Sequence, residues 1–219
     1  MTDKNIEKSW LDHMAGLDRY NRWFFGHIER YLGNYVWEAG SGIGTYSRFM
    51  LDRTQLILSD IVDEYLAALK NNFGKHGNVK ILKIDLLDNS NRELISQYRI
   101  DTILSINVFE HIKADRAAIE FIYNVLKKNG IFIFIGPNHK FLYNSLDKHA
   151  NHYRRYSLKE TVSYLKDLGF VIEKAFAFNK LAALAWFWHG SILRRKIIPP
   201  GSVSYYNMIV PIAGAIDSI

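Results

Sequence analysis

The chain has 219 residues, enough for one domain with a substantial core, and its 48% hydrophobic and 23% charged content is that of an ordinary globular protein. It contains no cysteine, which excludes disulfides, thiolate metal sites and cysteine nucleophiles. A formal charge of +6 favours an anionic partner such as nucleic acid, a phosphorylated substrate or a membrane surface, although a mildly basic enzyme without such a partner explains it equally well. The first residues lack the apolar segment of a signal peptide, so we expect a cytoplasmic protein.

The N-terminal residues 5–32 carry apolar and aromatic side chains at helical spacing, which predicts a helical segment that ends at Gly33 and Asn34. Tyr20 and Trp23 belong to the aromatic stripe of this segment. A stripe of this kind most often packs into a core.

Residues 35–39 predict a short apolar strand that carries one acid, Glu38, and runs into glycines at alternate positions: Gly40, Gly42 and Gly44. Glycine permits a tight turn and lets a ligand approach the backbone closely. With a helix expected over residues 45–51, the arrangement favours a nucleotide site. The third glycine follows the second after two positions, whereas the dinucleotide fingerprint requires three.

The pattern Glu-x-Gly-x-Gly-x-Gly over residues 38–44 resembles the first motif of the class I S-adenosylmethionine-dependent methyltransferases. In that family the loop, which here includes Ser41, runs under the methionine part of the cofactor. The resemblance implies S-adenosyl-L-methionine as cofactor and S-adenosyl-L-homocysteine as product. It also implies that the N-terminal segment covers the cofactor cleft, which makes Tyr20 a candidate cofactor contact. The alternative for this motif alone is a structural glycine turn in another α/β protein.

Residues 55–59 predict a second strand, which ends at Asp60 and Ile61 before a helix over residues 62–73. An acid at the tip of a second strand, about 20 residues past a glycine turn, can accept hydrogen bonds from both ribose hydroxyls of an adenosine-type ligand. We therefore expect Asp60 and Ile61 beside the cofactor. The alternative is that Asp60 caps the following helix.

Residues 79–84 predict a third strand that ends at Asp85 and Leu86, before a loop and a short helix. In the methyltransferases an acid at this place binds the adenine amino group, and the residue beside it packs on the ring. The resemblance implies these roles for Asp85 and Leu86.

Residues 101–106 predict a fourth strand that runs into the sequence Asn-Val-Phe-Glu-His-Ile at residues 107–112. This sequence resembles the segment after the fourth strand of many small-molecule methyltransferases. Asn107 and Glu110 fall where the carboxyl ends of strands place a ligand, and we assign Asn107 to the cofactor. His111 is a candidate substrate contact, either as a base or, more commonly in this context, as a cleft wall or helix cap.

An amphipathic helix over residues 114–128 and an apolar strand over residues 131–135 continue the alternation of strands and helices. The predicted fold is α/β, a doubly wound, mostly parallel open sheet of the Rossmann-like methyltransferase type with right-handed crossovers. A sixth strand is expected over residues 170–178. The family usually adds a seventh; none is evident, and we expect that the sequence stops short of it. We expect one domain over 1–219, with a helical cap at 1–34, a cofactor-binding core at 35–137 and the substrate loop, sixth strand and apolar helices at 138–219.

The stretch from His139 to Tyr156 is long for a connection within a compact domain, which usually indicates function. It resembles the segment "D-x-x-x-x-H-x-R-R-Y-S" of methyltransferases associated with polysaccharide and glycolipid pathways, which implies a small-molecule or glycan-type acceptor. A helix is expected to begin at Ser157 with a capping box and to end at Gly169. Candidate substrate contacts in this stretch are Tyr143, Asp147, Arg154, Arg155 and Tyr156.

Methyl transfer to a hydroxyl needs alignment of the reactants and a proton acceptor, and histidine is the usual acceptor near neutral pH. His152 and His139 are the candidate catalytic bases. Arg154 and Arg155 can bind a substrate phosphate or carboxylate, or one of them can hold the loop through Asp147. We expect no metal, because no histidine pair has the close helical spacing of a metal motif.

Residues 181–193 are apolar and aromatic, precede a basic cluster at 194–196, and are too few to span a bilayer. They either lie on an anionic membrane surface or pack on the cleft or a partner subunit. A second apolar stretch, residues 206–216, is interrupted by Pro211.

The sequence therefore predicts a methyltransferase that methylates oxygen on a small or lipid-linked glycan-type acceptor, with peripheral contact to the inner membrane face through 181–196 as an option. The alternatives are a quinone or other small-metabolite methyltransferase, and a non-catalytic module that binds the cofactor and regulates a partner. A nucleic-acid acceptor is disfavoured, because the sequence Gly-Pro-Asn-His at 136–139 is not the motif expected for base amines. The oligomeric state stays open.

Overall fold

A computed structural model describes residues 11–217, so the predicted helical residues 5–10 lie outside the described part of the chain. The chain divides into two compact units. The first comprises residues 24–108 and 114–135, together with the described residues up to 16. The second comprises residues 17–23 and 109–113 and the chain from residue 136 onward.

The first unit is built on a five-stranded parallel sheet with the strand order β3-β2-β1-β4-β5. The order reverses between β1 and β4, and ligands of open α/β sheets bind beyond the carboxyl ends of strands at such a point. The predicted first five strands are confirmed. Their bounds are β1 Tyr35–Ala39, β2 Gln55–Asp60, β3 Val79–Lys83, β4 Thr102–Ile106 and β5 Ile131–Ile135.

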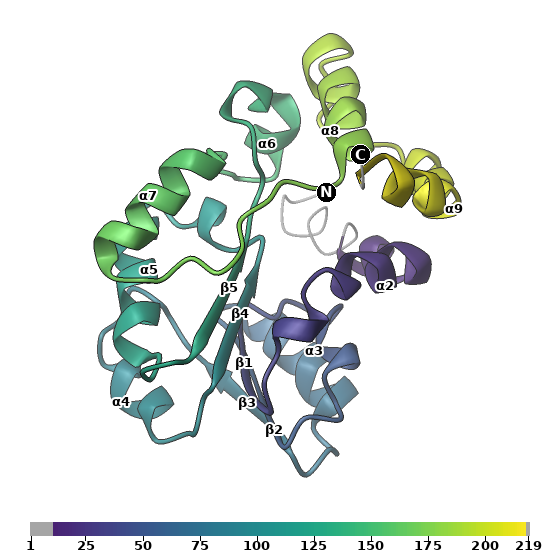
Figure 1. The fold of residues 1–219 in the computed structure, drawn as a ribbon. Helices are drawn as coiled ribbons and strands as arrows, with labels where there is room; N and C mark the ends of the chain where they lie inside the picture. The colour runs from purple at the N-terminus through teal and green to yellow at the C-terminus, as the bar shows by residue number, and fades with distance from the viewer. Residues whose placement is uncertain (1–10, 218–219) are drawn as a thin grey trace. The chain divides into compact units, whose positions relative to one another are not determined.

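Helices cover both faces of this sheet, as a doubly wound fold requires. Figure 1 shows α3 (Asp63–Phe73) on one side of the strands, and α4 (Asn91–Ser96) and α5 (Asp115–Val125) on the other. The buried side chains of α5 recur at helical spacing and include Ala118 and Ile122. The predicted doubly wound α/β fold is confirmed.

The core of the first unit lies around Trp37, whose side chain is fully buried on β1. Its indole N–H donates a hydrogen bond of 2.8 Å to Ser59 Oγ on β2, and its ring meets Phe121 of α5 edge-on at 6.4 Å. All residues of β4 are buried. This explains the continuous apolar character of the central strands, because helices cover the sheet on both faces.

Three predicted elements differ in the structure. The N-terminal helix is interrupted: residues 11–15 are helical, α2 spans Asp18–Gly26, and one 3-10 turn, η1, spans Glu29–Tyr31. Gly16 lies in the first break and Gly26 ends α2, since glycine is a poor helix former.

The predicted helix over residues 45–51 is wrong, because only the 3-10 turn η2, Ser47–Phe49, forms there. The hydroxyl of Ser47 donates instead to the buried carboxylate of Glu38, which ties the segment to β1.

The predicted sixth strand is also wrong, since residues 170–178 form neither helix nor strand and β5 is the last strand of the described chain. The alternation of apolar residues there is imperfect, and Val171 is 89% exposed rather than turned into a core.

The second unit is helical. The expected capping box at Ser157 is absent, but one forms at Asn144 and Asp147, whose side chains bond the first turn of α6. Gly169 ends α7 with φ +112°, as predicted. The bounds are η3 Phe109–His111, η4 Lys140–Leu142, α6 Ser145–His149, α7 Leu158–Leu168, α8 Lys180–Trp186, the π-helix η5 Phe187–Ile192 and α9 Pro200–Asp217.

The π-helix η5 follows α8 directly and packs against α6. Its Gly190 is buried, and a Cβ at that position would lie 2.0 Å from Asn144 Oδ1. The carbonyl of Gly190 accepts a 2.9 Å hydrogen bond from Ser145 Oγ. None of the described helices is long and apolar enough to cross a membrane.

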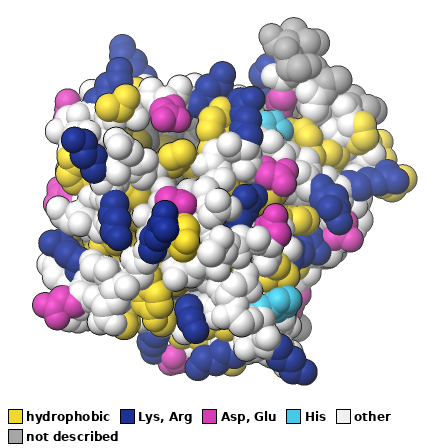
Figure 2. All heavy atoms as spheres, turned by 60° about the horizontal axis from the view of Figure 1, so that its bottom comes forward, with side chains coloured by type: hydrophobic (Ala, Val, Ile, Leu, Met, Phe, Trp, Pro, Cys, Tyr) yellow, Lys and Arg dark blue, Asp and Glu magenta, His cyan; other side chains and the backbone are white. Residues whose placement is uncertain are grey.

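The surface shows no single basic patch on the face drawn in Figure 2. Lys and Arg side chains are scattered over that face, with Asp and Glu between them. The formal charge of +6 is therefore not gathered into one stripe on this face, which gives no support to a nucleic-acid partner there.

We expect Leu104→Ala to lower the free energy of unfolding by about 2–5 kcal/mol, because it opens a cavity at the centre of a fully buried strand. Urea denaturation measures this loss. The exposed Lys80→Ala on β3 is the matched control, with a change within about 0.5 kcal/mol. Equal losses in the two variants would contradict the assignment of the core.

Candidate functional site

The glycine turn after β1 follows a backbone path that suits glycine. Gly40, Gly42 and Gly44 have φ values of +78°, +54° and +88°, all in the left-handed region. The N–H groups of Gly40 and Ser41 both donate to the carbonyl of Ser59, at 2.9 and 2.8 Å, which fixes the turn to β2.

The three glycines differ in what surrounds them. A Cβ on Gly40 would lie 2.3 Å from Val108 Cγ2, and one on Gly44 would lie 2.2 Å from the ring of Phe73. A Cβ on Gly42 would meet no atom within 4 Å. Gly40 and Gly44 are therefore required for packing, whereas Gly42 leaves open space beside the backbone. This space is what a cofactor lying along the loop needs.

Glu38 is buried beneath the turn, and the hydroxyl of Ser47 donates to its Oε2. Burial raises the pKa of Glu38 to about 7, although the hydrogen bonds from Ser47 and Ser41 lower it in part. In this structure the side chain fixes the turn to the segment that follows it, and the predicted cofactor contact stays a prediction.

Asp60 holds the same turn from the end of β2. Its Oδ2 accepts the N–H of Gly42 at 2.9 Å, and its Oδ1 accepts those of Ile61 and Val62 at 2.8 and 3.0 Å. Burial raises the pKa of Asp60, and the three backbone N–H groups offset part of that rise. These bonds lie before α3, whose N-cap is Val62 and which has no side-chain cap, so Asp60 does not cap that helix, and its ribose role stays a prediction.

The remaining predicted cofactor contacts of the first unit follow strands of the same sheet. Asp85 Oδ1 accepts the N–H of Leu87 at 2.8 Å, and Leu86 is buried. Asn107 is exposed with φ +53°, and its N–H donates to the carbonyl of Ile135. Polar residues thus stand at the end of β2 and after β3 and β4, and their contacts with the cofactor stay predictions.

Tyr20 belongs to the second unit. Its N–H donates to Asn207 Oδ1 at 2.9 Å, its hydroxyl accepts from Asn179 at 3.3 Å, and its ring meets Tyr206 edge-on at 5.9 Å. These contacts are those of a packed aromatic residue, the role such stripes most often have. Burial raises the pKa of the Tyr20 hydroxyl.

Asp147 is the centre of a polar cluster in the second unit. Its fully buried carboxylate accepts Arg155 Nε at 2.7 Å and His152 Nδ1 at 3.0 Å on Oδ1, and Trp186 Nε1 and the Asn144 N–H at 3.0 Å each on Oδ2. Burial alone would raise the pKa of Asp147, but these hydrogen bonds and the charge of Arg155 lower it below its ordinary value. The carboxylate is therefore ionised at neutral pH.

Both arginines of the loop bond to the protein. Arg155 is buried, donates also to the carbonyl of Asn138 at 3.1 Å, and lies over the ring of Trp186 at 4.8 Å. Arg154 donates to the carbonyl of Lys113 at 2.7 Å. The interpretation that one arginine holds the loop through Asp147 matches the contacts of Arg155.

Two predicted tyrosine contacts also brace this loop. Tyr143 donates its hydroxyl to the carbonyl of His152 at 2.8 Å, and the N–H of Tyr156 donates to the carbonyl of Pro137 at 2.8 Å. Of the predicted substrate contacts, Tyr143, Asp147 and Arg155 lie in one network with His152.

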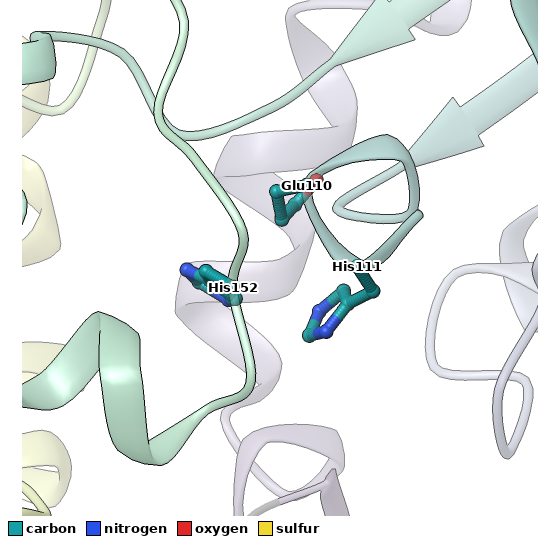
Figure 3. A group of neighbouring side chains, drawn as sticks. All are labelled: Glu110, His111 and His152. Carbon is teal, nitrogen blue, oxygen red and sulfur yellow. The ribbon is translucent and has the colours of Figure 1, made fainter. Parts of the chain in front are cut away.

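His152 stands beside His111 and Glu110, which lie together on η3 (Figure 3). The two imidazole rings meet edge-on with centroids 4.7 Å apart. His111 keeps an exposed face, yet partial desolvation and, secondly, the charge of His152 lower its pKa to about 4. Because Nδ1 of His152 faces an ionised carboxylate, it carries a proton and donates it to Asp147, and Nε2 is the ring nitrogen outside this bond.

An open pocket of about 310 Å³ is lined by both histidines together with Asn151 and Tyr153. The sequence analysis assigned no role to Asn151, Tyr153 or Trp186. The spacing Asn144-x-x-Asp147 is a signal in the sequence that could have predicted the capped helix α6. His139, the other candidate base, is exposed with φ +64° and is not among these lining residues.

Comparison with known proteins finds a similar domain over part of the chain. Residues 37–132 match the family model described as a methyltransferase domain. A relative from Dictyostelium discoideum, "Probable polyketide synthase 42", is 28% identical over 127 residues, and the match covers 49% of this chain but only 5% of that protein.

Solved structures share the fold at low sequence identity. A S-adenosylmethionine-dependent methyltransferase from Mesorhizobium loti matches with a TM-score of 0.59 and 15% identity over 78% of this chain and 91% of that chain. A complex of the Haloferax volcanii Trm112 activator with a methyltransferase matches with a TM-score of 0.61 and 16% identity. The match covers 76% of this chain and 75% of that chain. Residues 37–132 are therefore similar to a methyltransferase domain, and the chain shares the fold of S-adenosylmethionine-dependent methyltransferases, in agreement with the resemblance of its glycine motif.

We expect Gly40→Ala to destabilise the protein by about 1–3 kcal/mol more than Gly42→Ala, because only the first methyl group collides with Val108. Both variants also carry the strain of a left-handed backbone, about 1–2 kcal/mol. Urea denaturation compares them. The double variant Gly40→Ala/Val108→Ala should recover much of the difference, and a failure to do so would show that the collision is not the cause.

Proposed function

We propose that the chain is a S-adenosylmethionine-dependent methyltransferase that methylates an oxygen of a small-molecule or glycan-type acceptor. One observation carries the proposal beyond the family: the imidazole of His152, oriented by an ionised carboxylate, lines an open pocket. A hydroxyl must lose its proton to become a good nucleophile, and a neutral imidazole held in this way is suited to activate it.

The first unit supplies residues that fit the cofactor. The open side of the turn at Gly42 leaves room for a ligand close to the backbone, and Asp60, Asp85 and Asn107 stand at or just after the ends of β2, β3 and β4. When bound, S-adenosylmethionine supplies an electrophilic methyl group. The chain's own part is to bind and orient the two substrates, and to remove the proton of the acceptor hydroxyl.

The simplest means of removing that proton is direct transfer to Nε2 of His152. The bond from Nδ1 to Asp147 then stabilises the imidazolium that forms. Arg155 and Trp186 hold Asp147 in place and so act as positioning residues for His152.

The apolar segment over α8 and η5 supports a lipid-linked acceptor. Its exposed side chains include Leu184, Trp188 and Ile192, and exposed Arg194, Arg195 and Lys196 follow directly. Apolar side chains beside a basic cluster suit the anionic surface of a membrane, so we propose peripheral membrane contact through this segment.

Two variants test separately the two proposed tasks of the site, proton removal and cofactor binding. We expect His152→Gln to slow methyl transfer by roughly 10²–10⁴-fold while leaving cofactor affinity unchanged. Gly42→Val should abolish cofactor binding, because its side chain fills the open side of the turn. Transfer of labelled methyl groups into cell extract and calorimetric titration with the cofactor measure the two effects.

The exposed His76→Gln is the control, with unchanged rate and affinity. A loss in His139→Gln instead of His152→Gln would move the proton acceptor to the other candidate. Wild-type protein that binds the cofactor without turnover would show a binding module rather than an enzyme.

For the membrane contact, we expect the protein to sediment with vesicles that contain phosphatidylglycerol and not with neutral phosphatidylcholine vesicles. Replacing Arg194, Arg195 and Lys196 by Gln should weaken binding roughly 100-fold, at about 1 kcal/mol for each charge. The matched control replaces three exposed lysines elsewhere, Lys75, Lys80 and Lys127, by Gln. Equal weakening in both would contradict a localised contact.

A further inference from the structure

Glu110 is the buried group that the proposed mechanism leaves without a role. Its side chain is fully buried, and neither carboxylate oxygen has a hydrogen-bond partner among the described residues. A buried carboxylate without a hydrogen-bond partner is costly because it loses hydration, and for Glu110 the charge of Arg155 offsets only part of that cost. Its oxygens are therefore either protonated or bound to a cation from outside the chain.

Two histidines stand beside this carboxylate. His111 is the next residue on η3, and His152 comes from the facing segment after α6 (Figure 3). One ligand atom from each of the three residues lies within 4.8 Å of the others. Ligand atoms of one ion at about 2.0–2.2 Å from it lie roughly 3–3.5 Å apart. His111 is exposed, so its side chain is free of close packing that would prevent it from rotating toward an ion.

The backbone and a second carboxylate fix the arrangement. The N–H of Tyr153 donates to the carbonyl of Glu110 at 2.8 Å, which ties the two segments together next to the side chains. Asp147 accepts the Nδ1 proton of His152 at 3.0 Å and leaves Nε2 as the available ligand atom. Metal-binding histidines commonly have such a carboxylate behind them, since it sets the tautomer and the ring orientation.

We propose that Glu110, His111 and His152 bind one divalent cation of the zinc, iron or manganese class. Two imidazoles and one carboxylate suit these ions better than magnesium or calcium, which favour oxygen ligands. Three protein ligands leave coordination positions open for a substrate or water. The pocket lined by both histidines gives an acceptor access to those positions. The sequence predicted no metal because it has no histidine pair at close helical spacing. The three ligands proposed here come instead from two segments that are distant in sequence.

The inference rests on the proposed function and deepens it. A cation that held the acceptor hydroxyl would lower its pKa, so the proton would pass to solvent water and the oxygen would keep the electron pair for its bond to the methyl group. The bond between the methyl group and the cofactor's sulfur would break at the same time, and S-adenosylhomocysteine would leave with that bond's electron pair. His152 then acts through the cation rather than as a free base. The acceptors best suited carry two adjacent oxygens, as in a vicinal diol or a catechol, because both can occupy open positions on one ion.

The test uses the full chain without an affinity tag, stripped of metal with a chelator and titrated with Zn²⁺ by calorimetry and with Co²⁺ by visible absorption. We expect one ion per chain. His111→Gln, His152→Gln and Glu110→Gln should each weaken binding by roughly 10–100-fold or more. Since Glu110→Gln places an amide in a buried position, the exposed His111→Gln is the decisive variant. His76→Gln, outside the cluster, should bind as the wild type does.

Absence of stoichiometric binding, or binding unaffected by His111→Gln, overturns the metal site and identifies Glu110 as a protonated buried acid. Methyl transfer measured on the same preparations separates this outcome from failure of the proposed function. Full turnover by the stripped protein keeps the methyltransferase and overturns the cation's role. Specific metal binding without any turnover, even with metal restored, supports the site and overturns the proposed function.

Discussion

The second unit depends on a single buried carboxylate. Asp147 accepts hydrogen bonds from the backbone of Asn144 and from the side chains of His152, Arg155 and Trp186. These four donors come from the start of α6, the loop after it and α8. Because the carboxylate compensates a buried guanidinium, losing it would leave a charge unpaired in the interior, a defect that costs several kcal/mol in other proteins, on the order of 3–5. The same carboxylate that stabilises the buried Arg155 also orients the imidazole of His152, so the position of His152 depends on the packing around Asp147.

The first unit divides its glycine motif between two tasks. Gly40 and Gly44 are required because Val108 and Phe73 pack against their α-carbons, whereas the space beside Gly42 is open. The three glycines of this motif thus comprise two packing positions and one position beside open space. Substitutions at the first two would impair folding and binding together, and only the third reports on binding with little disturbance of the packing.

Much of the first unit was predictable because its signals are local. Strands β1 to β5 follow from short apolar runs, and the turn follows from glycine spacing. The helix expected over residues 45–51 failed because Ser47 bonds across to Glu38, a contact that periodicity does not encode. The sixth strand over 170–178 failed because alternation alone does not provide a neighbouring strand with which to pair.

The candidate site of the second unit was predictable only in part. His152 and Asp147 fall in a motif that suggested a base and a polar partner, and their contact is present at 3.0 Å. The meeting of His152 with Glu110 and His111 was not predictable, because these residues are distant in sequence. The roles of Arg155 and Trp186 likewise depend on how the loop folds back on α8.

The wide turn of η5 affects how insertions and deletions of single residues at this place would change the structure. A π-helix carries one more residue per turn than an α-helix, and here the N–H of Leu193 reaches back five residues to Trp188. That extra residue brings Gly190 against Asn144, where no side chain fits. Removing one residue would restore α-helical register and move Gly190 away from Asn144, which would also disturb the hydrogen bond from Ser145 to the Gly190 carbonyl. Homologues that differ by a single insertion or deletion here should thus differ in how firmly α6 is held, independently of which catalytic residues they share.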